Sequence, residues 1–183
     1  MFKALRSLFS AAPARPQLRF LVVMRHAHAL PADADQPDTD RELSDLGHAA
    51  CRAQGAWLTA TLDQALEAAF ISPAQRAQQT YAGVLETAAT LLPEAPRCPA
   101  LLYDDPRAYL QSLEQEAVSS ALVVTHNPGL GLWLAETIGG SPAMQRELLD
   151  IDPGDVALLC HDEGAWHLVQ LHRAPSGQRG QPA

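Results

Sequence analysis

The chain has 183 residues, of which 47% are hydrophobic and 19% charged, and its formal net charge is -8. This length and composition are typical of one globular domain and exclude a disordered or fibrous chain. The negative balance argues against general binding to nucleic acid or to an anionic membrane, so a site for an anion must carry its positive charge locally.

A buried strand is predicted near the start of the folded chain. Residues 1–17 carry basic and no acidic side chains, and we expect a flexible arm there. The apolar run at 20–24 is uninterrupted, which is typical of a strand covered on both faces. It ends directly in Arg25 and His26, with His28 two residues further on. The strand therefore leads into a cluster of groups that can bind phosphate or metal.

Helices and strands alternate through the rest of the chain. After a loop rich in aspartate and proline, Ser44 is predicted to cap a helix that runs to about residue 62, and another helix is expected at about 74–92. Further helices are predicted after Asp105 and Asn127, because each is a capping residue followed by proline. Buried strands are predicted at 68–72, 96–103 and 121–125, with an antiparallel hairpin between 156 and 172.

This alternation predicts an α/β fold. We expect a three-layer α/β/α sandwich around a mostly parallel six-stranded sheet with a C-terminal antiparallel hairpin. A single domain is expected over residues 18–173, followed by a disordered tail at 174–183. The three cysteines lie far apart without metal-ligand spacing, which indicates reduced thiols and a cytoplasmic location.

Polar side chains follow three of the predicted strands. Parallel sheets place their ligands at the carboxyl ends of the strands, so these side chains are expected to meet at one edge. A lone histidine or arginine at such a place is more often structural, but several at the same edge favour a functional site. The residues are Arg25, His26 and His28 after the first strand, Ser72 and Arg76 after the second, and His126 and Asn127 after the strand at 121–125.

Two histidines and two arginines are the groups that phosphoryl transfer needs. Imidazole has a pKa of about 6.5 and is a competent nucleophile near neutral pH, while two guanidinium groups can hold a phosphate. This scheme requires no metal and no cofactor. A catalytic zinc site on His26, His28 and His126 is an alternative, which the adjacent fixed charge of Arg25 makes less favourable.

Four segments, in order, resemble the histidine phosphatase (phosphoglycerate mutase-like) superfamily. Residues 24–27 are similar to its Arg-His-Gly signature and residues 72–80 to its Ser-Pro-x-x-Arg-Ala-x-Gln-Thr segment. Residues 125–128 resemble its second-histidine turn, and residues 41–47 resemble its Arg-x-Leu-Ser/Thr-x-x-Gly helix entry. The resemblance spans residues 20 to about 172 and implies the phosphoglycerate mutase-like fold.

The resemblance also implies a role for each matched side chain. His26 would be the nucleophile that becomes phosphorylated, and Arg25 and Arg76 would bind the phosphate. His126 would complete the pocket and stabilise the transferring group. The implied reaction is a two-step hydrolysis through a phosphohistidine intermediate.

Departures from the family pattern bear on activity and substrate. Ala27 replaces the usual glycine, His28 stands where acidic or amide residues are common, and the pocket roles of His28 and Asn127 stay open. Family members that cleave alcohol esters resemble one another in placing an acid after the third strand, and here Asp104 is the only credible donor. Imidazole can leave neutral from phosphohistidine, so it needs that acid far less than an alkoxide does.

Short loops without an obvious lid predict a pocket open to a protein-borne phosphate. The chain therefore resembles the SixA-type phosphohistidine phosphatases, and a phosphorylated protein is the expected partner. One alternative is a small-molecule phosphomonoesterase with Asp104 as its acid. Another is a non-catalytic phosphate- or phosphoprotein-binding module in which Ala27 has abolished catalysis. No nucleic-acid or membrane partner is expected, and the sequence carries no signal for an oligomeric state.

Overall fold

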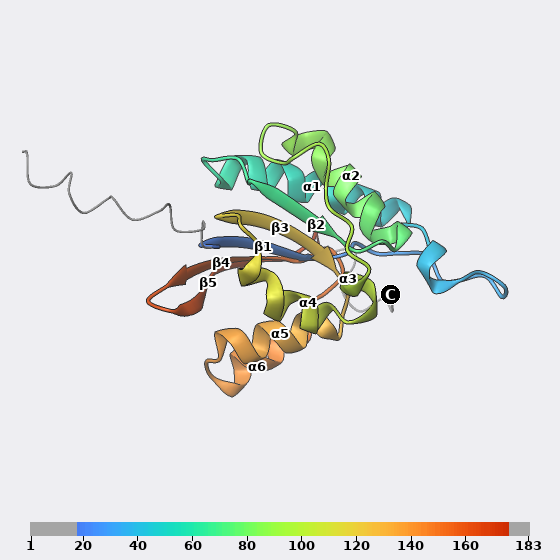
Figure 1. Cartoon of the computed structure of the whole chain (residues 1–183). Helices are drawn as coiled ribbons and strands as arrows, with labels where there is room; N and C mark the ends of the chain where they lie inside the picture. The colour runs from blue at the N-terminus through green and yellow to red at the C-terminus, as the bar shows by residue number, and fades with distance from the viewer. Residues whose placement is uncertain (1–17, 176–183) are drawn as a thin grey trace, which may run out of the picture.

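The computed structural model describes residues 18–175 (Figure 1). The expected arm at 1–17 and the expected tail from residue 176 onward lie outside the described residues. Ala174, at the start of that expected tail, is buried, and its backbone N–H donates to Oδ1 of Asp155 at 2.7 Å. The packed part of the chain therefore includes Ala174.

One mixed sheet forms the middle of the molecule, with strand order β2-β3-β1-β4-β5. Strands β1 (Phe20–Arg25), β2 (Ala68–Ile71) and β3 (Ser120–Thr125) are parallel neighbours. Strand β4 (Val156–Asp162) runs antiparallel to β1 and forms a hairpin with β5 (Ala165–His172). The C-terminal antiparallel hairpin is confirmed.

The predicted strand at 96–103 is wrong, so the described chain has five strands in the sheet and not six. Only Arg97 reaches the sheet, through an isolated bridge to Phe70. Leu101–Asp104 forms a one-turn helix, α3. A short apolar run does not distinguish a strand from a helical turn, and Pro99 lacks the N–H that a strand ladder needs.

Helices cover both faces of the sheet, as the three-layer prediction requires. Helices α1 (Asp45–Thr61) and α2 (Gln75–Ala88) lie together on one face (Figure 1). The other face carries α3 and the helices α4 (Pro106–Ser112), α5 (Gly129–Ile138) and α6 (Pro142–Leu149). Two short 3-10 turns complete the set, η1 (Asp38–Asp40) and η2 (Leu113–Gln115).

Side-chain caps fix the starts of two predicted helices. The hydroxyl of Ser44 accepts from the backbone N–H of Gly47 at 3.1 Å at the start of α1. The carboxylate of Asp105 accepts from the N–H of Ala108 at 3.0 Å at the start of α4. Each cap satisfies a backbone donor that the first helical turn leaves without a partner. Both predicted starts are confirmed.

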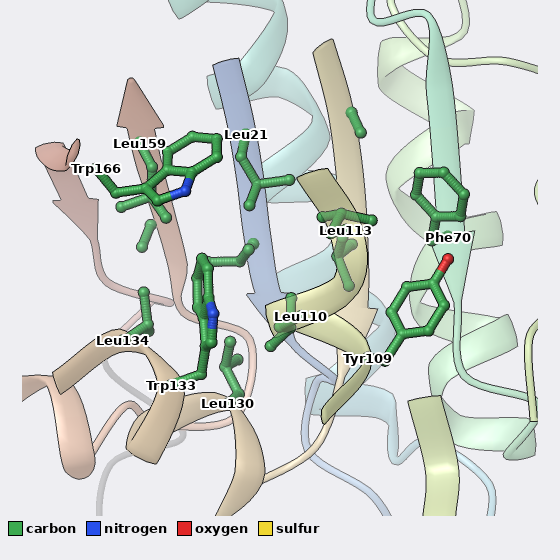
Figure 2. Close-up of a cluster of buried hydrophobic side chains, with 14 of the residues drawn as sticks. Leu21, Phe70, Tyr109, Leu110, Leu113, Leu130, Trp133, Leu134, Leu159 and Trp166 are labelled. Atoms are coloured by element: carbon green, nitrogen blue, oxygen red, sulfur yellow. The ribbon is translucent and has the colours of Figure 1, made fainter. Parts of the chain in front are cut away.

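Apolar side chains pack against both faces of the central strands. Alternate residues of β1 point in opposite directions, so Leu21 joins one cluster while Val22 and Met24 join the other. Figure 2 shows the first cluster, where Trp133 of α5 and Trp166 of β5 approach edge to face with ring centroids 6.5 Å apart. Because both faces are buried, polar groups gather at the strand ends.

Within residues 18–175 no helix is both long and apolar enough to cross a membrane.

Candidate active site

The register of the parallel strands brings three polar segments to one edge of the sheet. Met24 of β1 pairs with Val124 of β3, which in turn pairs with Ile71 of β2, so the three strands end level. His26 and His126 then follow neighbouring strands, and their ring centroids lie 5.0 Å apart. The predicted convergence at the carboxyl ends of the strands is what the structure shows.

The two ring nitrogens of His26 have different partners. Nδ1 lies 2.8 Å from the carbonyl oxygen of Ala27, which can only accept, so Nδ1 carries the ring proton. The Nε–H of Arg76 donates to Nε2 of His26 at 3.2 Å. A guanidinium has no acceptor, so Nε2 must hold the lone pair. His26 is therefore fixed in the neutral form with its unprotonated nitrogen beside Arg76.

Both imidazoles of the site resist protonation. Burial, followed by the proximity of His126, lowers the pKa of His26 well below its usual value, although the hydrogen bond to Ala27 acts in the opposite direction. Burial is also the main reason why the pKa of His126 is lowered to about 3, with Arg76 and Arg25 adding to the effect. Two neutral imidazoles are thus present at neutral pH, each with one unprotonated ring nitrogen.

His126 contacts the residue that follows β2. Its Nε2 lies 2.6 Å from the hydroxyl oxygen of Ser72, which also accepts from the backbone N–H of Ala74 at 3.4 Å. Tyr103 meets the His126 ring edge-on, with centroids 5.6 Å apart. Nδ1 of His126 is buried and has no hydrogen-bond partner in the described chain. Such an orphaned polar atom in a site is available to a ligand.

Arg25 and Arg76 supply positive charge from two different elements. Nη1 of Arg25, at the end of β1, donates to the carbonyl oxygen of Ile151 at 3.0 Å, and its buried Nε lacks a partner among residues 18–175. Arg76 lies in the first turn of α2 and is only 5% exposed. The two guanidinium groups can both contribute donors to a bound anion.

Asp38 is a site residue that the sequence did not indicate. Its carboxylate accepts from Nη2 of Arg76 at 2.8 Å, from Nη1 of Arg41 at 3.2 Å and from the hydroxyl of Tyr103 at 3.1 Å. Burial alone would raise the pKa of Asp38, but the hydrogen bonds from Arg41 and Arg76 outweigh it and lower the pKa. Asp38 is therefore a charged member of the site.

His28 lies beside the start of helix α1, and not against the His26 ring. Its Nδ1 is 2.8 Å from the hydroxyl of Ser44, the residue that caps α1, and its backbone carbonyl accepts from the N–H of the same residue at 3.0 Å. His28 thus joins β1 to the start of α1. In the described chain no group of three or more His, Cys, Asp and Glu side chains is arranged to hold a metal ion.

Asn127 joins two parts of the backbone, and the helix after it starts later than predicted. Helix α5 begins at Gly129, not directly after Asn127, although Oδ1 of Asn127 does accept from the N–H of Gly131 at 3.1 Å. Nδ2 of Asn127 donates to the carbonyl oxygens of Leu149 and Ile151 at 3.2 and 3.3 Å. These contacts hold the end of α6 and the loop that follows it close to the site.

Ala27 is accommodated without strain where the family has glycine. The residue is fully buried within the cluster under α1 and α2, and its N–H donates to Oγ1 of Thr80 at 3.0 Å. Among described non-glycine residues, only Glu163 has a positive φ. The backbone at Ala27 therefore does not require glycine, and its methyl group adds apolar contact.

A cavity of about 360 Å³ opens beside His126. Tyr103, Asp104 and Arg107 line it on the side of α3 and α4. Asp104 is exposed, and no hydrogen bond or ion pair of its carboxylate is found in the described residues. The predicted acid therefore lies in the wall of a cavity that reaches His126.

Comparisons with known proteins lead to the superfamily that the motifs resemble. The model of the histidine phosphatase superfamily (branch 1) matches residues 21–97. The chain is 35% identical over 123 residues to the phosphohistidine phosphatase SixA of Escherichia coli (strain K12). The aligned residues cover 64% of this chain and 73% of that protein.

Solved structures agree. The protein histidine phosphatase SixA complexed with tungstate is 28% identical, with a TM-score of 0.68 and coverage of 84% of this chain and 96% of that one. A phosphoglycerate mutase from Plasmodium falciparum is 14% identical, with a TM-score of 0.58 over 86% of this chain and 94% of its own. This more distant likeness bears on the fold alone, and it matches the expected phosphoglycerate mutase-like architecture.

Proposed function

Because the chain belongs to the histidine phosphatase superfamily, we propose that it hydrolyses protein-borne phosphohistidine through a covalent phosphohistidine on its own His26. His26 is the proposed nucleophile. Arg25, Arg76 and His126 are proposed to hold the phosphoryl group, and Asp104 is the candidate acid for any ester substrate. The proposal rests above all on the tautomer of His26, whose Nε2 lone pair faces the Nε–H of Arg76.

In the first step, Nε2 of His26 attacks the phosphorus atom of the substrate. The P–N bond of the substrate breaks, and its electron pair leaves with the substrate imidazole, which departs neutral when its other nitrogen carries the proton. Charge on the phosphoryl oxygens is stabilised by the guanidinium groups of Arg25 and Arg76. No metal takes part in this step.

In the second step, water attacks the phosphorus atom of phosphorylated His26, and both of its protons remain on the phosphate that is released. The N–P bond breaks and its electron pair returns to Nε2. The proton on Nδ1 stays hydrogen-bonded to the carbonyl oxygen of Ala27 throughout, so His26 leaves as a neutral imidazole. One contact, from Ala27, thereby makes Nε2 a nucleophile in the first step and a good leaving group in the second.

Several observations support phosphohistidine as the substrate class. The E. coli relative is a phosphohistidine phosphatase, and this chain covers 73% of it. Asp38, the carboxylate in contact with Arg76, has a lowered pKa and is unsuited to donate a proton at neutral pH. A leaving group that needs no strong acid suits this site better than an alkoxide does.

The phosphorylated protein and the enzyme would have to share a compartment. Cys51, Cys98 and Cys160 are all free thiols. This supports the cytoplasmic location that we propose, where thiols stay reduced.

The test is to incubate the enzyme with a phosphohistidine-bearing protein and, separately, with a simple alkyl phosphate, and to trap acid-labile phosphate on the enzyme. Wild type should release phosphate from phosphohistidine and become labelled, whereas His26→Ala should do neither. His167→Ala, an exposed histidine on β5, is the matched control and should behave as wild type.

Labelling that persists in His26→Ala would refute the nucleophile assignment. Turnover of the alkyl phosphate alone would favour the phosphomonoesterase alternative, for which the observation in favour is Asp104 in the cavity wall beside His126. Phosphate binding without labelling on any substrate would leave the non-catalytic module.

A further inference from the structure

Asp38 holds the outer end of the Arg76 guanidinium with two different groups. Nη2 of Arg76 donates to Oδ2 of Asp38 at 2.8 Å, and Nη1 donates to the backbone carbonyl oxygen of the same residue at 2.5 Å. The two residues are separated by 38 positions in the sequence and lie on different elements, η1 and α2. One aspartate thus accepts hydrogen bonds from both terminal nitrogens of a buried arginine.

These two hydrogen bonds determine the direction of the remaining N–H donors of Arg76. A guanidinium has five N–H donors in a fixed plane, and three of these are engaged by Asp38 and by Nε2 of His26. One N–H remains on each terminal nitrogen. Because the group is planar, holding its outer end fixes the direction of Nε–H, which here is directed at the nitrogen proposed to react.

We propose that Asp38 is a positioning residue that aligns Arg76 with the phosphoryl group during its transfer to and from His26. The inference rests on the proposed function in taking Nε2 of His26 as the nucleophile. Asp38 acts through Arg76 and need not touch the substrate.

The surroundings of Asp38 fit a positioning role better than a structural one. Its side chain is 51% exposed, so the fold does not depend on burying it. The same carboxylate accepts from Arg41 and from the hydroxyl of Tyr103, whose ring meets His126 edge-on. A single exposed carboxylate therefore accepts hydrogen bonds from side chains of three segments: Arg41 beside η1, Arg76 of α2 and Tyr103 of α3.

Loss of the Asp38 carboxylate should affect kcat and KM differently. Removing the charge of Asp38 leaves the charge of Arg76 without its paired carboxylate and makes the site more positive, so ground-state binding of phosphate should not weaken. Misdirecting Arg76 should instead slow the chemical step. Displacement of a positioned group by about 1 Å costs up to about 100-fold in rate, so we expect kcat to fall about 10- to 100-fold with no rise in KM.

The experiment compares Asp38→Asn with Asp35→Asn, which removes the same charge from an exposed residue of the same loop. Steady-state rates are measured with the phosphohistidine protein and with phosphoramidate, a small N-phosphoryl donor. Hydrogen exchange of the Arg76 Nε–H is followed by NMR in ligand-free enzyme. The double variant Asp38→Asn/Arg76→Lys tests whether Asp38 acts through Arg76.

In Asp38→Asn we expect at least tenfold faster exchange of the Arg76 Nε–H together with the loss in kcat, while Asp35→Asn matches wild type and the double variant matches Arg76→Lys. Unchanged exchange and kcat in Asp38→Asn would overturn the inference. So would a lower KM at unchanged kcat, which would make Asp38 a competitor of phosphate. If wild type does not turn over phosphohistidine, the proposed function fails, yet the Arg76 exchange still decides whether Asp38 holds the guanidinium.

Discussion

The Nε–H of Arg76 donates to Nε2 of His26 at 3.2 Å, so a permanently charged guanidinium lies next to the nitrogen proposed as nucleophile. In the ligand-free site this bond holds the imidazole ring in place and occupies its lone pair. A phosphoryl group that enters must take over both partners, its phosphorus atom meeting Nε2 and one of its oxygens meeting the guanidinium. The positions of Nε2 and of the guanidinium in the ligand-free site therefore indicate where the phosphoryl group would bind.

The same contact predicts how His26 titrates. Burial first, then His126, Arg76 and Arg25, lower the pKa of His26, and only the hydrogen bond to Ala27 opposes them. An NMR titration of the ring should therefore show His26 neutral at pH 6.5 and protonated only well below it. In Arg76→Gln one positive neighbour is lost, and the His26 pKa should rise. A midpoint near 6.5 in wild type would contradict this electrostatic account.

The sequence pattern predicted well that His26, Arg76 and His126 lie together, because these residues follow the ends of buried parallel strands. Strands β1, β2 and β3 have apolar, buried interiors and run parallel, so the side chains at their carboxyl ends had to meet. Asp38 was missed because its partner Arg76 lies far along the chain and composition marks the loop only as polar. Helix α6 was also missed, although Ser141 followed by Pro142 is a capping signature that could have indicated it.

His126 predicts a loss of stability in acid. Its folded-state pKa is about 3, against about 6.5 in an unfolded chain. Between these values the unfolded chain binds more protons, so the free energy of unfolding falls as the pH drops below 6.5. At pH 5.0 the loss from this one residue is about 2 kcal/mol relative to pH 7.5.

His126→Gln removes the titrating group but keeps a side chain able to bond Ser72. Urea unfolding at pH 7.5 and 5.0 should show a difference between the two pH values that is smaller by about 2 kcal/mol in the variant than in wild type. Equal pH dependence in the two proteins would mean that the pKa of His126 is the same in the folded and unfolded chain, which would contradict the prediction.

Ser72 predicts a separate effect on rate. Its hydroxyl lies 2.6 Å from Nε2 of His126, and both residues are buried. Ser72→Ala removes a hydrogen bond worth about 1 kcal/mol, which corresponds to about fivefold in kcat if the bond orients His126 during transfer. Steady-state kinetics and urea unfolding of the same sample separate the two effects. A stability loss with unchanged kcat would make Ser72 purely structural.

Ala27→Gly restores the family residue, yet we expect it to bring no gain. The alanine methyl is buried in an apolar cluster, and its backbone does not need the freedom of glycine. The variant should lose about 1–2 kcal/mol of unfolding free energy through lost burial and greater freedom of the unfolded chain. Its kcat should stay within about twofold of wild type. Thermal unfolding and turnover measure both, and a large gain in kcat would show that the methyl hinders phosphate.

Asp104 distinguishes cleavage of P–N from cleavage of P–O bonds. If the leaving group is a neutral imidazole, Asp104→Asn should change phosphohistidine turnover by less than about twofold, whereas any alkyl phosphate hydrolysis should fall by about 100-fold or more, as expected for loss of a general acid. Asp105→Asn is the matched control, because it removes the same charge next door while asparagine still caps α4. If Asp104→Asn slowed both substrates by the same large factor, the substrate imidazole would need a proton donor, and the preference for phosphohistidine would lose its chemical basis.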